Sequence, residues 1–190
     1  MKTVYIDTNI FLSFLRQTDP NFQTVKSLFE IPNLRYVTGI VTLLELNSIL
    51  VREGELVRTG LLEILRKDGS EKSFDLTVKE IVILVITYLL TKTKVSILND
   101  AENEPGEAFS HSTKINSIMK IALNINSETK LRTLDNIHFA TALYHSTILE
   151  TKINYFVTLD ENFLSKKVNC QKLMETLVLH PNSVIQLEKS

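Results

Sequence analysis

The sequence predicts a layered α/β fold in which helices pack on a mostly parallel sheet. Short apolar segments without alternating polar residues are typical of strands that are buried on both faces of a sheet. Longer segments with apolar residues at helical spacing separate these strands, which favours α/β layers. The composition is globular, because 44% of the 190 residues are hydrophobic and 23% are charged. We therefore expect a single domain over residues 1–190.

In the first half of the chain, apolar strands alternate with helices. We expect strands at residues 3–6, 35–40 and 94–98. We expect helices at residues 9–16, 21–29, 41–53, 55–67 and 78–91, and a short extended piece at 73–77. The most apolar run, Ile81–Leu90, would span about 15 Å as a helix, which is half of a bilayer core, so it predicts a buried helix rather than a membrane span.

In the second half, one change in composition interrupts this pattern. Residues 99–112 are acidic and polar and contain Pro105-Gly106, which predicts a loop or a mobile entry to the next helix. Beyond this segment we expect helices at residues 114–124 and 135–149, and strands at 154–160 and 177–181.

The charge and the cysteine content of the chain limit the classes of function that it can have. The net charge of −1 provides no overall basic field for nucleic acid, so such binding would need a local patch or a bound metal. The single Cys170 excludes an internal disulfide, and we expect it to be a small buried hydrophobic residue rather than a catalytic thiol. The first residues do not resemble a signal peptide, and we expect a cytoplasmic protein.

Four carboxylates occupy positions where an ionised side chain is costly unless it is paired or binds a metal. Asp7 and Asp160 end apolar strands, where parallel sheets form their sites. Asp135 opens a predicted helix, and Glu45 lies within one, with apolar residues one turn away on either side. A cluster of such acids would need a cation, and Mg²⁺ or Mn²⁺ prefers oxygen ligands of this kind.

Each acid also has a purely structural interpretation. Asp7, Asp135 and Asp160 can each act as the N-cap of a following helix. Glu45 can extend to solvent or form a salt bridge. His138 lies one helical turn after Asp135, where we expect a supporting or packing role rather than that of a general base.

Four segments that contain these acids resemble, in order, the signature segments of PIN-domain nucleases: YIDTNIFLSFL, VTLLELNSIL, LDNIHFATALYH and FVTLDENF. The resemblance implies a three-layer α/β/α sandwich with a mostly parallel sheet of about five strands. It implies a catalytic, metal-holding set of four acids, Asp7, Glu45, Asp135 and Asp160. It also implies that Asn9 and Thr158 support this set by hydrogen bonding.

The resemblance further implies a metal-dependent endoribonuclease, in which one or two Mg²⁺ or Mn²⁺ ions activate water and neutralise charge on the RNA phosphate. Many family members are toxins inhibited by a small antitoxin, and the family often dimerises, so both an antitoxin and a homodimer are expected. The separation of Glu45 and Asp135 exceeds that of compact toxin members, which indicates an enlarged helical region at about 54–130. We expect Lys130 and Arg132 to line the RNA cleft, because they precede Asp135.

The sequence also bears on three other interpretations. A hydrolase of the haloacid dehalogenase type needs a second aspartate two positions after Asp7, where this chain has Asn9. A dinucleotide-binding fold needs G-x-G-x-x-G after the first strand, and that pattern is absent there. The remaining alternative is a catalytically silent PIN-like module that binds RNA or protein, against which the four intact acids argue.

Overall fold

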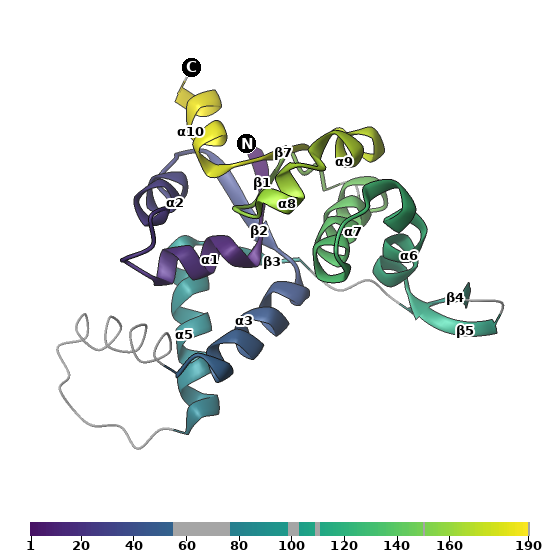
Figure 1. Cartoon of the computed structure of the whole chain (residues 1–190), viewed down its shortest axis with the longest axis horizontal. Helices are drawn as coiled ribbons and strands as arrows, with labels where there is room; N and C mark the ends of the chain where they lie inside the picture. The colour runs from purple at the N-terminus through teal and green to yellow at the C-terminus, as the bar shows by residue number, and fades with distance from the viewer. Residues whose placement is uncertain (55–76, 99–102, 109–110, 150, 190) are drawn as a thin grey trace.

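The computed structural model describes residues 1–54, 77–98, 103–108, 111–149 and 151–189, and it contains a central sheet of five parallel strands (Figure 1). In spatial order the strands are β3 (Ser96–Ile97), β2 (Leu34–Thr38), β1 (Lys2–Ile6), β6 (Tyr155–Val157) and β7 (Leu177–Leu179). The parallel sheet of about five strands predicted from the sequence is therefore confirmed.

The central strand β1 is apolar because both of its faces are covered. Val4 and Ile6 belong to one hydrophobic core cluster, whereas Tyr5 belongs to a second cluster on the opposite face. In the parallel register, Ile6 is the partner of Val157 in β6. The residues that follow these two strands therefore meet at the same edge of the sheet.

Helices cover both faces of the sheet, which confirms the three-layer α/β/α arrangement. The first core cluster is covered by α1 (Thr8–Leu15), α2 (Phe22–Phe29), α3 (Ile40–Arg52), α5 (Val78–Thr93) and α10 (Pro181–Lys189). The second cluster is covered by α6 (Ser117–Thr129), α7 (Thr133–Thr147), α8 (Glu161–Leu164) and α9 (Lys167–Leu173).

The apolar run Ile81–Leu90 lies in α5, as expected, where Val82, Val85 and Leu89 are fully buried. Among the described residues, no helix has the length and apolarity needed to cross a membrane. Cys170 is buried in the second core cluster, as predicted.

The structure corrects the prediction for the polar segment 99–112. Strands β4 (Asn103–Ala108) and β5 (His111–Asn116) form an antiparallel hairpin that projects from the body of the molecule (Figure 1). Polar composition predicts a loop, but it does not exclude an antiparallel ribbon, whose strands pair through their backbones. The helix predicted at 55–67, and almost all of the extended piece at 73–77, lie outside the described residues.

Candidate active site

Asp7 follows strand β1 and lies at the carboxyl edge of the sheet, where the residue is only 4% exposed. Its Oδ1 accepts a 2.7 Å hydrogen bond from the backbone N–H of Thr8, which makes Asp7 the N-cap of α1. Its Oδ2 accepts hydrogen bonds from Asn9 Nδ2 at 2.8 Å and from Thr158 Oγ1 at 2.6 Å. Asp7 is thus the N-cap of α1, as one interpretation of the sequence predicts, and this role is compatible with binding a metal ion.

The ends of β1 and β6 are tied together by the same polar side chains. Asn9 Oδ1 accepts a 2.9 Å hydrogen bond from the backbone N–H of Leu159. Thr158 Oγ1 accepts a 3.0 Å hydrogen bond from the backbone N–H of Asp160. Asp160 caps α8, because its Oδ1 accepts hydrogen bonds from the backbone N–H groups of Asn162 and Phe163. The cap interpretation of Asp160 is therefore also correct.

Glu45 reaches from α3 toward α1 and α7. Its Oε2 accepts a short hydrogen bond from Thr8 Oγ1 and lies 2.7 Å from His138 Nε2. Burial alone would raise the pKa of Glu45, but the hydrogen bonds from His138 and Thr8 lower it overall. Glu45 is therefore held ionised inside the protein by α1 and α7, rather than extended into solvent.

His138 lies among the acids, closer to them than the sequence indicated. Its Nε2 is 3.6 Å from Asp7 Oδ1 and 3.3 Å from Thr8 Oγ1. Burial opposes a charged imidazole, yet the pKa of His138 is raised because Glu45 and Asp7 stabilise the cation. One ligand atom each from Asp7, Glu45 and His138 lie within 4.8 Å of one another, a spacing that can hold a metal ion.

Asp135 is the third residue of α7, whose N-cap residue is Arg132, so the cap interpretation of Asp135 is wrong. Burial, together with the negative charges of Asp7 and Asp160, raises its pKa to about 6. Burial also raises the pKa of Asp7, against the opposing effect of His138. Carboxyl groups that resist ionisation side by side fit a site for a divalent cation, which relieves their repulsion.

The model of the PIN domain family matches residues 4–168, which is most of the sequence. The chain belongs to the PIN domain family. This confirms the resemblance of the four segments, and because PIN domains are typically nucleases it supports a nuclease. No curated protein sequence matches the chain.

One solved structure that is similar to this PIN domain is the crystal structure of VapBC2 from Rickettsia felis bound to a DNA fragment from their promoter. The sequence identity is 11%, and the TM-score is 0.49. The match covers 94% of this chain and 98% of that chain.

The two basic residues expected near the site are exposed on the surface of the PIN domain. Lys130 ends α6 in a left-handed conformation, and its carbonyl accepts a hydrogen bond from the Lys166 ammonium group. With its oxygen facing Arg132, the Asn162 amide accepts bonds of 3.2 and 2.9 Å from that guanidinium. Arg132 thus contacts the helix that Asp160 caps, and RNA binding by this residue stays a prediction.

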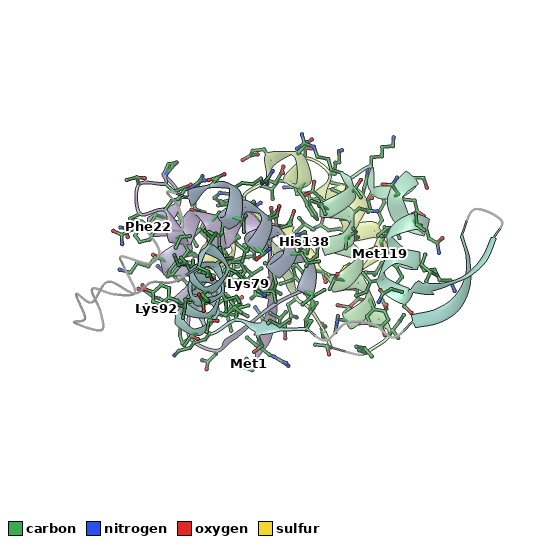
Figure 2. The ribbon with its side chains drawn as sticks, turned by 90° about the horizontal axis from the view of Figure 1, so that it is seen from below. Met1, Phe22, Lys79, Lys92, Met119 and His138 are labelled. Atoms are coloured by element: carbon green, nitrogen blue, oxygen red, sulfur yellow. The ribbon has the colours of Figure 1, made fainter. Side chains whose placement is uncertain are left out.

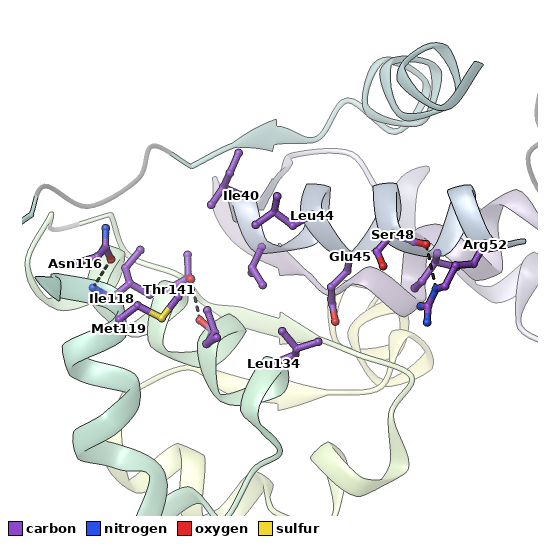
Figure 3. A pocket seen from close by; sticks show the side chains of 13 residues that line it. Ile40, Leu44, Glu45, Ser48, Arg52, Asn116, Ile118, Met119, Leu134 and Thr141 are labelled. Atoms are coloured by element: carbon purple, nitrogen blue, oxygen red, sulfur yellow. Dashed lines mark hydrogen bonds between the residues drawn. The ribbon is translucent and has the colours of Figure 1, made fainter. Parts of the chain in front are cut away.

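An apolar cavity of about 540 Å³ adjoins the acid cluster of the PIN domain (Figure 3). It lies between α3 on one side and the first turns of α6 and α7 on the other. Glu45 lines this cavity and also contacts His138, so the cavity opens beside the acids. Its walls include Leu44, Met119 and Leu134, whose side chains are partly exposed.

Proposed function

We propose that this PIN domain is a metal-dependent endoribonuclease that hydrolyses RNA phosphodiester bonds at its carboxylate cluster. The observation that carries the proposal is the gathering of one buried acid, Asp7, and three half-buried acids near the carboxyl edge of the sheet. Asp7 and Asp135 have raised pKa values there, and each is raised in part by other acids of the cluster. Raised pKa values of this kind are expected in a functional site where a bound cation offsets the repulsion between the carboxylates.

Asp7, Glu45, Asp135 and Asp160 would hold one or two Mg²⁺ or Mn²⁺ ions. A bound ion would supply Lewis-acid activation of water and would neutralise charge on the scissile phosphate. The chain's own contribution is to keep the carboxylates in place before substrate arrives. Asn9 and Thr158 hold Asp7, and Thr8 holds Glu45.

The direct test is cleavage of a labelled single-stranded RNA by the purified chain with Mn²⁺, compared with the same reaction in EDTA. Asp7→Asn should lower kcat at least 100-fold, because it removes one ligand charge while keeping the shape of the side chain. Glu175→Gln is the matched control, since Glu175 is an exposed carboxylate outside the cluster. Full activity of Asp7→Asn would refute the site assignment.

The expected partners are further proposals that rest on the sequence resemblance. A small antitoxin and a homodimer would each bury surface of the folded chain, and both would act in the cytoplasm. Light scattering of the purified chain measures its mass in solution and so tests the homodimer. Co-expression with the product of the gene upstream, followed by co-purification, tests the antitoxin.

The alternative function is that of a catalytically silent module that binds RNA or protein. It predicts RNA retention without cleavage in the presence of Mn²⁺.

A further inference from the structure

His138, for which the sequence predicts a supporting or packing role, lies beside Asp7 and Glu45 of the acid cluster. Its side chain is 1% exposed and lies near the middle of the body in Figure 2. It is placed by α7, whereas Glu45 is placed by α3 and Tyr5 by β1. The imidazole therefore links three elements that are distant in sequence.

The 2.7 Å contact between His138 Nε2 and Glu45 Oε2 requires a proton between the two atoms. A carboxylate oxygen is the acceptor in such a contact, so the proton belongs to Nε2. Thr8 Oγ1 donates to the same Oε2. Two donors on Oε2 fix the rotation of the Glu45 carboxylate. The other oxygen, Oε1, is therefore held in a defined orientation in which it can bind an ion.

The other ring nitrogen of His138 is held by Tyr5. Tyr5 Oη lies 3.1 Å from Nδ1 and accepts a 3.2 Å hydrogen bond from the backbone N–H of Gly39. The tyrosine ring is itself stacked on Phe156 at 4.9 Å between centroids. This chain of contacts runs from the sheet core to the carboxylate and leaves the imidazole little freedom to rotate.

We propose that His138 is a positioning residue for the metal site: Tyr5 holds the ring, and the Nε2–H holds the Glu45 carboxylate. A nitrogen that donates its proton to Glu45 is not a free ligand, so His138 does not coordinate the ion despite its closeness to Asp7. This inference rests on the proposed function, because it concerns how that same site binds its ion.

The test measures Mn²⁺ binding to the purified chain without RNA, by electron paramagnetic resonance. His138→Leu removes the donor and should weaken Mn²⁺ binding 10- to 100-fold, the usual effect of losing a residue that orients a ligand. His138→Gln keeps an N–H donor and should stay within about threefold of wild type. Tyr5→Phe removes the partner of Nδ1 and should weaken binding about 3- to 10-fold, which keeps the test available if His138→Leu does not fold.

The matched control is His145→Gln, because His145 is equally buried on α7 but lies two turns further along the helix. It should leave Mn²⁺ binding unchanged even if it lowers Tm. The proposal is overturned if His138→Leu and Tyr5→Phe bind Mn²⁺ as wild type does, or if His138→Gln is as weak as His138→Leu. Direct ¹⁴N coupling to the bound Mn²⁺ would also overturn it, since it would show that His138 is a ligand.

The same measurement separates this inference from the proposed function. If the wild type binds Mn²⁺ but does not cleave RNA, the ribonuclease proposal fails while the effects of His138 variants on binding still decide the inference. If the wild type binds no Mn²⁺, the metal site and the positioning role are both overturned.

Discussion

Thr158 is the residue whose removal most sharply tests how the site is held together. The side chain is fully buried, donates to Asp7 Oδ2 at 2.6 Å, and accepts from the Asp160 N–H at 3.0 Å. Thr158→Val keeps the shape but removes these two bonds, and also the 3.0 Å bond that Thr158 Oγ1 accepts from Asn9 Nδ2. Losing a bond to a charged group costs about 1.5–3 kcal/mol, and an unsatisfied N–H adds about 1 kcal/mol. We expect a total of about 3 kcal/mol, which lowers Tm by about 6–12 °C for a domain of this size.

Urea unfolding of the metal-free chain, monitored by circular dichroism, measures this loss of stability. The comparison is valid when the m value is the same in the wild type and the variant. Thr176→Val is the matched control, because Thr176 is equally buried but donates only to the backbone carbonyl of Ile153. A neutral bond of that kind contributes about 1 kcal/mol. Equal losses in the two variants would refute the conclusion that Thr158 holds Asp7 and the Asp160 backbone in place.

Three other perturbations have expected outcomes. Gly39→Ala should destabilise the chain by about 1–3 kcal/mol in urea, because a Cβ would lie 2.8 Å from Tyr5 Oη and 2.9 Å from Thr141 Cγ2; a loss below about 0.5 kcal/mol would contradict this. Burial and the charges of Asp7 and Asp160 raise the pKa of Asp135 from 3.8 to about 6, so its contribution to stability is complete below pH 3.8 and is lost as the pH rises to about 6. Metal-free Asp135→Asn should lack that loss in thermal melts, and parallel pH profiles would count against the raised pKa. Mn²⁺ at about 100 times its Kd should stabilise the wild type by about 2.7 kcal/mol, and an unchanged Tm would argue against a bound ion.

The sheet and the acids were predictable because their signals are local in the sequence. An apolar segment that ends in a carboxylate, as at Asp7 and Asp160, marks the edge of a buried strand without any tertiary information. The start of α7 was less predictable. Asp135 suggested a cap, but Arg132 precedes the first turn and leaves Asp135 inside the helix. Helix ends depend on tertiary packing as well as on capping preference.

The position of His138 was out of reach of sequence reasoning. Its spacing from Asp135 placed the two residues on one helix, but the contact with Glu45 joins residues 93 positions apart. That contact exists because α3 and α7 both approach the carboxyl end of β1. The hairpin of β4 and β5 was missed for a different reason, since polar composition does not distinguish a loop from a ribbon outside the core.

The most direct test of the central claim is a crystal structure of the chain soaked in Mn²⁺, with anomalous diffraction used to locate the ion. The account predicts an anomalous peak at the carboxyl edge of the sheet, coordinated by oxygen atoms of Asp7 and of at least one more acid among Glu45, Asp135 and Asp160. A map without a peak at this edge, or a peak elsewhere on the molecule, would contradict the account.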